Sequence, residues 1–298
     1  MKLWIVSLVT VLGLSLLGYL PVYSTSMLSM VERDLDIPVV EPVRVETAPL
    51  QVPVYHSPAV TLGDAGEYAP PDFRAYKDSG ARKQAFYDYL LPKIHKANRQ
   101  VQRERQWLLM LRQKVLQDQV LTTQELEELT TYETRYDIDG NGSIASRVGK
   151  LLNRVDVVPA SLVVAQAAKE SGWGTSRFAR QANNFFGIWC FYEGCGIKPS
   201  RREEGRTHEV ATFRTVEEGT RYYVRTINTH WAYADLRGLR AVARRQNQSF
   251  GGERLAVGLV RYSERGTDYV EEIQSMIRVN RLHRFTRADE WVQRPDSV

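Results

Sequence analysis

The stretch from Pro159 to Trp189 constrains the fold of this chain more than any other, because it combines a helix, a glycine break and an aromatic cluster. Apolar side chains at Leu162, Val163 and Ala167 recur at helical spacing, and the leading proline suits a first helical turn. A pair of glycines then ends the pattern. We expect Gly172 to be the left-handed cap of this helix.

Glu170 is the single acidic residue of this stretch and falls in the last turn of the expected helix, on or beside its apolar face. The negative end of the helix dipole and the nearby apolar surface both disfavour a carboxylate anion, so the pKa of Glu170 should be raised. A carboxyl group that stays protonated near neutral pH suits a general acid. At this point Glu170 is either a catalytic acid or a glutamate that merely ends an amphipathic helix.

Three motifs in this order resemble the glucosaminidase domain. They are Glu-Ser-Gly-Trp-Gly at 170–174, Asn-Asn-Phe-Phe-Gly-Ile at 183–188, and a segment at 262–269 that begins and ends with tyrosine. The third motif carries an insertion and lacks the family's proline. The resemblance covers roughly 145–285, and the insert between the two cysteines is most similar to the bacterial Bax-like branch, which is unrelated to the apoptosis factor.

The resemblance implies a mainly α (α+β), lysozyme-like catalytic domain with a small β-hairpin lobe. It implies hydrolysis of peptidoglycan on the reducing side of N-acetylglucosamine, with Glu170 as the acid. Tyr262 matches the motif tyrosine and would stabilise the positively charged sugar or orient its acetamido group. The family's second carboxylate lies on the first hairpin strand, for which we rank Glu204 first, then Glu209, then Glu203. Substrate assistance without any second carboxylate stays open.

The same motifs suggest which residues bind substrate. Asn183, Asn184 and Tyr269 match motif positions. Flat aromatic faces for sugar rings are expected at Trp173, Phe186 and Trp189, although core packing competes for such side chains.

Cys190 and Cys195 are the only cysteines, and in an exported chain two cysteines usually pair, so we expect a disulfide beside the substrate groove. The sequence contains no metal-binding or phosphate-binding motif, so no metal or cofactor is expected.

The rest of the chain predicts export. Residues 1–24 contain an uncharged apolar run that indicates a signal peptide or an inner-membrane anchor. Seven of the 12 prolines fall in 25–71, which favours a semi-rigid linker. We expect a helical region at 72–135, in which one helix starts with a capping box at Thr122 and Glu125. We expect the catalytic domain at 136–285, with one helix over 251–262, and a tail at 286–298. The loop from Asp137 to Ser143 resembles a calcium loop but has Val148 where the last carboxylate should be, so a polar turn is favoured.

The chain carries a formal net charge of +5. A basic surface suits polyanionic partners, here the carboxylates of cell-wall peptides on peptidoglycan glycan strands, facing the periplasm. Nucleic acid is the rival partner, but no recognised motif supports it. Two other functions stay open: a non-catalytic wall-binding module, and an endo-N-acetylglucosaminidase acting on other glycans.

Overall fold

The computed structural model describes residues 69–200 and 208–286. Several predicted features lie outside these residues: the apolar segment 1–24, nearly all of the linker, the candidates Glu203 and Glu204, and the tail after residue 286. Within the described ranges, no helix is both long and apolar enough to cross a membrane. The fold is mainly helical with one small antiparallel sheet, as the sequence predicted.

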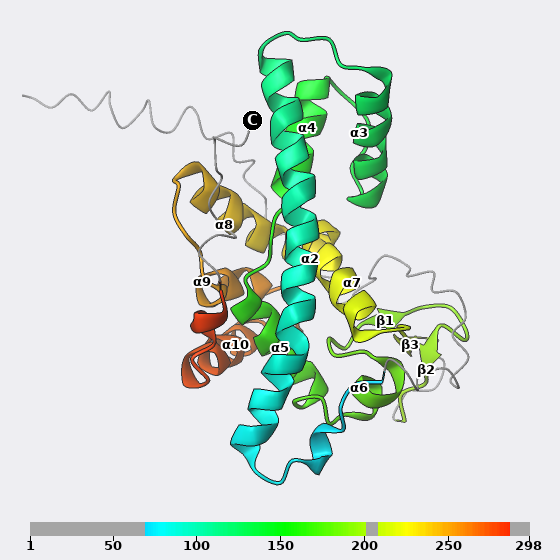
Figure 1. The fold of residues 1–298 in the computed structure, drawn as a ribbon, viewed down its shortest axis with the longest axis vertical. Coiled ribbons are helices and arrows are strands. Elements are labelled where there is room, and N and C mark those ends of the chain that lie inside the picture. Colours follow the sequence, from blue (N-terminus) through cyan, green and yellow to red (C-terminus); the bar gives the residue numbers. More distant parts are fainter. Residues whose placement is uncertain (1–68, 201–207, 287–298) are drawn as a thin grey trace, which may run out of the picture. The chain divides into compact units, whose positions relative to one another are not determined.

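The long helix α2 spans Ser79–Leu116 and runs along α4, α5 and α7 (Figure 1). It begins where the Asp78 carboxylate accepts a hydrogen bond from the Ala81 amide, and it continues through Pro92. Before it, the 3₁₀ turn η1 (Phe73–Ala75) places Phe73 in the core, 5.6 Å from the ring of Phe86. The segments 72–135 and 136–285 therefore share one apolar core, and the boundary between them stays a prediction.

Two shorter helices follow. Helix α3 (Thr123–Arg135) opens with the capping box that the sequence predicted at Thr122 and Glu125. Helix α4 (Ile144–Arg154) begins after a polar turn whose carboxylates are held by cations, since Lys150 Nζ lies 2.6 Å from Asp139. No group of three or more side chains suited to a metal ion occurs in the described residues.

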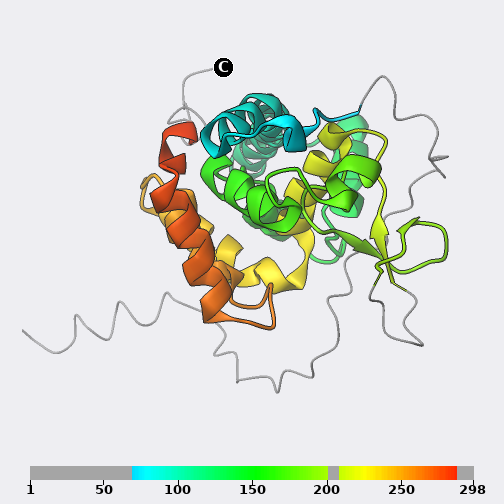
Figure 2. The ribbon, with the colours of Figure 1, turned by 90° about the horizontal axis from the view of Figure 1, so that it is seen from below.

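Helix α5 (Ala160–Ser171) lies at the centre, where it contacts α2, α9, α10 and η4 (Figure 2). The elements around it are α6 (Arg177–Ala182), α7 (Val216–Thr229), η2 (Trp231–Tyr233), α8 (Ala234–Arg245), α9 (Gly252–Ala256), η3 (Val257–Leu259), α10 (Thr267–Val279) and η4 (Leu282–Phe285). We expected one helix over 251–262. The structure instead has α9 followed by η3, because glycines weaken helix formation there and Gly258 packs against the backbone of Leu236.

Asp156, between α4 and α5, is buried among three arginines. Arg244 donates hydrogen bonds to both of its carboxylate oxygens, at 2.9 and 2.6 Å, while Arg240 donates to the carbonyls of Asp156 and Val157. Burial by itself raises the pKa of Asp156, but the charges of Arg105, Arg240 and Arg244 outweigh it and hold that pKa at about 2. This ion cluster ties α2 and α8 to the segment between α4 and α5.

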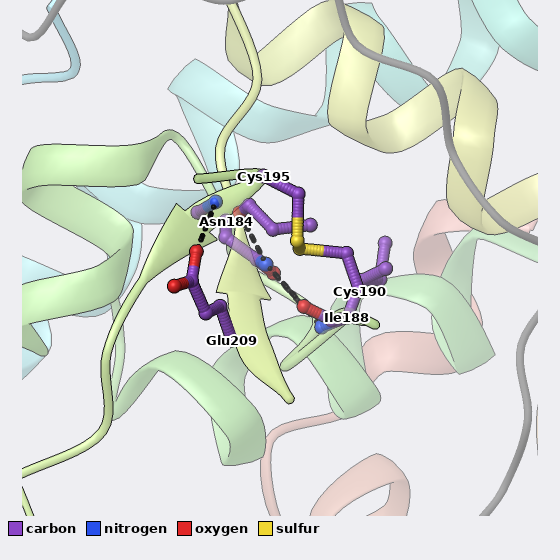
Figure 3. The surroundings of a disulfide bond; sticks show 7 residues. Asn184, Ile188, Cys190, Cys195 and Glu209 are labelled. Atoms are coloured by element: carbon purple, nitrogen blue, oxygen red, sulfur yellow. Dashed lines mark hydrogen bonds between the residues drawn. A yellow bond between two sulfur atoms is a disulfide. The ribbon is translucent and has the colours of Figure 1, made fainter. Parts of the chain in front are cut away.

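The sheet consists of β1 (Trp189–Cys190), β2 (Gly196–Ile197) and β3 (Glu209–Ala211), with β3 in the middle and both pairings antiparallel. Gly196 opposes Ala211, and a Cβ at Gly196 would meet the Val210 carbonyl at 1.9 Å, so only glycine fits. The expected disulfide is present between Cys190 and Cys195 and joins β1 to the start of β2 (Figure 3). The predicted hairpin turn lies outside the described residues.

Candidate active site

Glu170 stands in the last turn of α5, as its sequence position predicted. The Pro159 carbonyl accepts the first helical hydrogen bonds, from Leu162 and Val163, and Gly172 ends the helix with φ of 57°. Apart from Lys169 and Glu170, the residues of α5 are buried, so the helix is held by packing on all sides. This rigid support fixes the position from which the Glu170 carboxyl projects.

A chain of hydrogen bonds runs through the core to Glu170. The hydroxyl of Tyr223 donates to Oε1 of Gln166, whose Nε2 donates to the hydroxyl oxygen of Tyr269 at 3.1 Å. The Tyr269 hydroxyl then donates to Oε1 of Glu170 at 3.0 Å. Because Gln166 is fully buried, its amide orientation sets the direction of every bond in the chain. The result is that one oxygen of Glu170 is held and the other, Oε2, is not used by this chain.

Burial raises the pKa of the Glu170 carboxyl above its ordinary value. The hydrogen bond from Tyr269 and the charge of Lys169 oppose this effect but do not cancel it. The neighbouring Glu272 is neutralised by Arg265 and Lys169, whose hydrogen bonds lower its pKa to about 2. Glu170 is therefore the carboxyl of this region that retains a proton most readily.

Tyrosines form the wall beside the acid. The ring of Tyr262 lies 4.9 Å from that of Tyr269 and 5.8 Å from that of Tyr233. Burial, and after it the charge of Glu170, raise the pKa of Tyr262, so its hydroxyl stays protonated. The structure thus brings three of the predicted residues together, Glu170, Tyr262 and Tyr269.

The motif asparagines are buried and bond to the backbone. Asn184 donates to the carbonyls of Ile188 and Ala211, both at 2.8 Å, and its oxygen accepts from the Phe186 and Ile188 amides. Asn183 has φ of 51° and donates to the Phe213 carbonyl at 3.0 Å. These bonds shape the turn that carries Gly187 against the acid. Their predicted contact with substrate stays a prediction.

Gly187 in this turn lies beside the acid. It has φ of +64°, and a Cβ built there would lie 3.3 Å from Oε2 of Glu170. Phe186 beside it stacks on Tyr223, with ring centroids 4.1 Å apart and an interplanar angle of 11°. The turn therefore contacts both ends of the hydrogen-bond chain.

The two tryptophans differ in their surroundings. Trp173 packs edge-on against Phe86 and Tyr87 of α2, with centroids 5.5 and 5.8 Å away. Trp189 is 38% exposed and stacks on His208 at 4.2 Å. Of the two, Trp189 is the more exposed, and His208 covers one face of its ring.

Glu209 lies inside the sheet, only 2% exposed, and its carboxylate accepts a hydrogen bond from the Gly196 amide at 2.9 Å (Figure 3). That bond pins β2 to β3 beside the disulfide. The other candidates for the second carboxylate, Glu203 and Glu204, fall in the undescribed segment 201–207.

Sequence reasoning did not assign a role to Gln166, Tyr223 or Tyr233. The sequence does contain a signal for Gln166, because it precedes Glu170 by four residues and therefore lies on the same face of the helix. The two tyrosines come from α7 and η2, and no local pattern connects them to the acid.

Comparison with known proteins agrees with this geometry. Residues 146–282 match the family model described as mannosyl-glycoprotein endo-beta-N-acetylglucosaminidase. The chain is 34% identical to the protein bax of Escherichia coli K12 over 211 residues, which cover 70% of this chain and 74% of that protein. No solved structure matches. The chain therefore belongs to the glucosaminidase-domain family of glycoside hydrolases and, within it, to the Bax-like proteins.

Proposed function

We propose that this protein hydrolyses the β-1,4 bond on the reducing side of N-acetylglucosamine in peptidoglycan, with Glu170 as general acid. The observation that carries the proposal is the state of this carboxyl: its pKa is raised by burial, and one of its oxygens is held by Tyr269. A buried carboxyl beside tyrosines is suited to protonating a departing glycosidic oxygen.

Glu170 supplies the proton that is transferred. Tyr269 donates a hydrogen bond to Oε1 of this carboxyl, and Tyr262 also hydrogen-bonds to it, so two tyrosines hold the acid in place. Protonation of the leaving oxygen breaks the bond to the sugar anomeric carbon, on which positive charge develops. General acids of this kind contribute roughly 10²–10⁴-fold to rate.

Tyr262 stabilises that developing charge or orients the substrate's acetamido group. Its hydroxyl is neutral and close to the acid, so it supplies a dipole without adding a second full charge. The acetamido oxygen of the substrate can then bond to the anomeric carbon as an internal nucleophile, which lessens the demand on the protein. Water afterwards displaces the acetamido oxygen from that carbon and returns a proton to the Glu170 carboxylate, which completes the hydrolysis.

For a second carboxylate we retain Glu204 first. Glu209 would have to give up its bond to the Gly196 amide and leave the sheet to reach substrate, so we keep it behind Glu204. A nucleophile would stand about 5 Å from the acid, and a base that activates water about 6.5–9.5 Å away.

We further propose that the protein is exported and acts from the periplasm, with residues 1–24 as signal peptide or inner-membrane anchor. The disulfide supports this, because such bonds persist in oxidising compartments.

The test is mass spectrometry of muropeptides released from purified sacculi. Fragments ending in reducing N-acetylglucosamine are expected from the wild type. Glu170→Gln should release at least 10²-fold less, while Glu271→Gln, which neutralises an exposed glutamate on α10, should match the wild type. Normal release by a folded Glu170→Gln protein would remove the assignment. If neither the wild type nor the variants release muropeptides, a non-catalytic binding module is favoured. If the wild type cleaves only other N-acetylglucosamine glycans, the substrate is not peptidoglycan.

Alanine at Glu203, Glu204 and Glu209, assayed singly on the same sacculi, identifies the second carboxylate. Activity within a few-fold of the wild type for all three would indicate substrate assistance.

A further inference from the structure

A cavity lies away from the acid. It has a volume of about 1120 Å³ and is lined by residues of α3, α7 and η2, together with the end of α4, the start of α8 and the loop after α3. Glu170, Tyr262 and Tyr269 are not among its lining residues. Figure 1 shows α3 and α7 on the same side of α2. We call this the α3–α7 cavity.

The walls of the α3–α7 cavity are cationic. Arg135, Arg154, Arg225 and Arg237 line it against a single carboxylate, Asp137. Arg237 donates to the carbonyls of Ile227 and His230, at 2.9 and 2.8 Å, rather than to an acidic group. Burial, and after it the charge of Arg154, lower the pKa of Arg237 to about 10.

Arg225 is the most available of these cations. Its side chain is exposed and its guanidinium lies 5.3 Å from the centre of the Tyr222 ring. Among the described residues, no carboxylate forms an ion pair with it. By contrast, Arg135 pairs with Glu104 at 2.6 Å. Arg225 is therefore placed to receive an anion from solution.

The cavity also has an apolar side. Trp231 is 56% exposed and lines it. Thr130 and Thr134 of α3 use their hydroxyls to donate to carbonyls one turn earlier in the same helix. A ligand that joins carboxylates to aliphatic or sugar surface would satisfy both sides of the cavity, whereas a small inorganic anion would leave the indole uncovered.

The turn η2 connects this cavity to the active site. His230, at its start, lines the cavity, and its ring lies 6.1 Å from that of Tyr233. Tyr233 in turn lies 5.8 Å from Tyr262, beside the acid. The two sites are thus connected through the residues of one short turn.

We propose that the α3–α7 cavity binds the carboxylate-bearing peptide attached to the glycan strand, so that the protein prefers peptide-substituted over bare glycan. The proposal rests on the proposed function. Helix α3 (123–135) precedes the residues matched by the family model, 146–282, so one wall of the cavity is supplied by a part of the chain outside that model.

Binding is measured without turnover. The full chain carrying Glu170→Gln is co-sedimented with intact sacculi and with sacculi stripped of peptides by an amidase. Two further variants are made in this background, Arg225→Gln and Arg221→Gln. Both remove one exposed arginine from α7, but Arg221 lies outside the cavity and pairs with Glu217 at 3.9 Å, which makes it the matched control.

We expect tighter binding to intact than to stripped sacculi, with a difference that shrinks as salt is added. Arg225→Gln should weaken binding to intact sacculi about three- to tenfold and leave binding to stripped sacculi unchanged. Arg221→Gln should change neither. The proposal would be overturned if Arg225→Gln and Arg221→Gln weakened binding equally, or if Arg225→Gln weakened binding to intact and stripped sacculi equally. It would also be overturned if the chain bound neither kind of sacculus. If the wild type releases no muropeptides but the Glu170→Gln chain still binds intact sacculi more tightly than stripped ones, the proposed catalysis is refuted. The assignment of the cavity to peptide binding then stands.

Discussion

Replacing Gln166 with leucine tests whether the buried hydrogen-bond chain positions the acid. Leucine has a similar volume but removes the bonds to Tyr223 and Tyr269. Two neutral hydrogen bonds contribute about 0.5–1.5 kcal/mol each, and an orphaned buried hydroxyl costs about 1–3 kcal/mol. Because Tyr223 is buried and loses its acceptor, we expect Gln166→Leu to lower the free energy of unfolding by about 2–4 kcal/mol.

A second change separates the orphaned hydroxyl from the lost bonds. Adding Tyr223→Phe to Gln166→Leu removes the hydroxyl and should recover about 1–2 kcal/mol of that loss in urea denaturation. The recovery should not extend to activity, which we expect to stay about tenfold or more below the wild type, since Tyr269 is no longer held.

The pH profile distinguishes positioning from packing. The bond from Tyr269 lowers the pKa of Glu170, so a loosened Tyr269 should raise that pKa further. A general acid must be protonated, so the alkaline limb of kcat/KM should move to higher pH in Gln166→Leu. The reasoning would be refuted if Gln166→Leu and the double variant with Tyr223→Phe were equally stable. It would also be refuted if the alkaline limb of kcat/KM in Gln166→Leu stayed where it is in the wild type.

Three further changes probe the acid and its surroundings. Glu170→Gln should stabilise the protein near pH 7, by about 1.4 kcal/mol for each unit by which burial raises the pKa, and this gain should vanish below about pH 4. The sign follows because the folded state binds the extra proton, so the wild type loses stability as pH rises; thermal melts over pH 4–8 measure it. Gly187→Ala should lower the free energy of unfolding by about 1 kcal/mol because of the positive φ at this position, and it should reduce turnover because the added Cβ contacts Glu170. Denaturation and activity of the purified variant measure the two effects. The double change Cys190→Ser and Cys195→Ser should cost about 2 kcal/mol by the loop-closure model, and thiol counting on denatured periplasmic wild type should find no free thiol.

The sequence predicted the parts of the site that local patterns determine. Spacing placed Glu170 at the end of α5, Gly172 as its cap and the capping box at Thr122, and the structure confirms each of these. The disulfide followed from cysteine count and compartment. In each case, residues close in sequence decide the outcome.

Interactions between distant segments were beyond sequence reasoning. Gln166 and Tyr223 are 57 residues apart, and Arg240 and Asp156 are 84 apart. An arginine or tyrosine in an amphipathic helix looks like any surface residue until its partner is known. The asparagines show the converse, because a motif marked them as important while only packing revealed that their amides hold the backbone of the 184–188 turn.

The position of α5 has a consequence for how the protein is made. Its neighbours come from both sides of it in the chain: α2 precedes it, while α9, α10 and η4 follow more than 80 residues later. A nascent chain that has just completed α5 cannot yet bury that helix, and Tyr269, which orients the acid, has not been synthesised. Pairings between distant segments form late in folding. The candidate active site is therefore among the last parts of the molecule to be assembled, and a truncated chain lacking α10 would carry Glu170 without the Tyr269 hydroxyl that holds it.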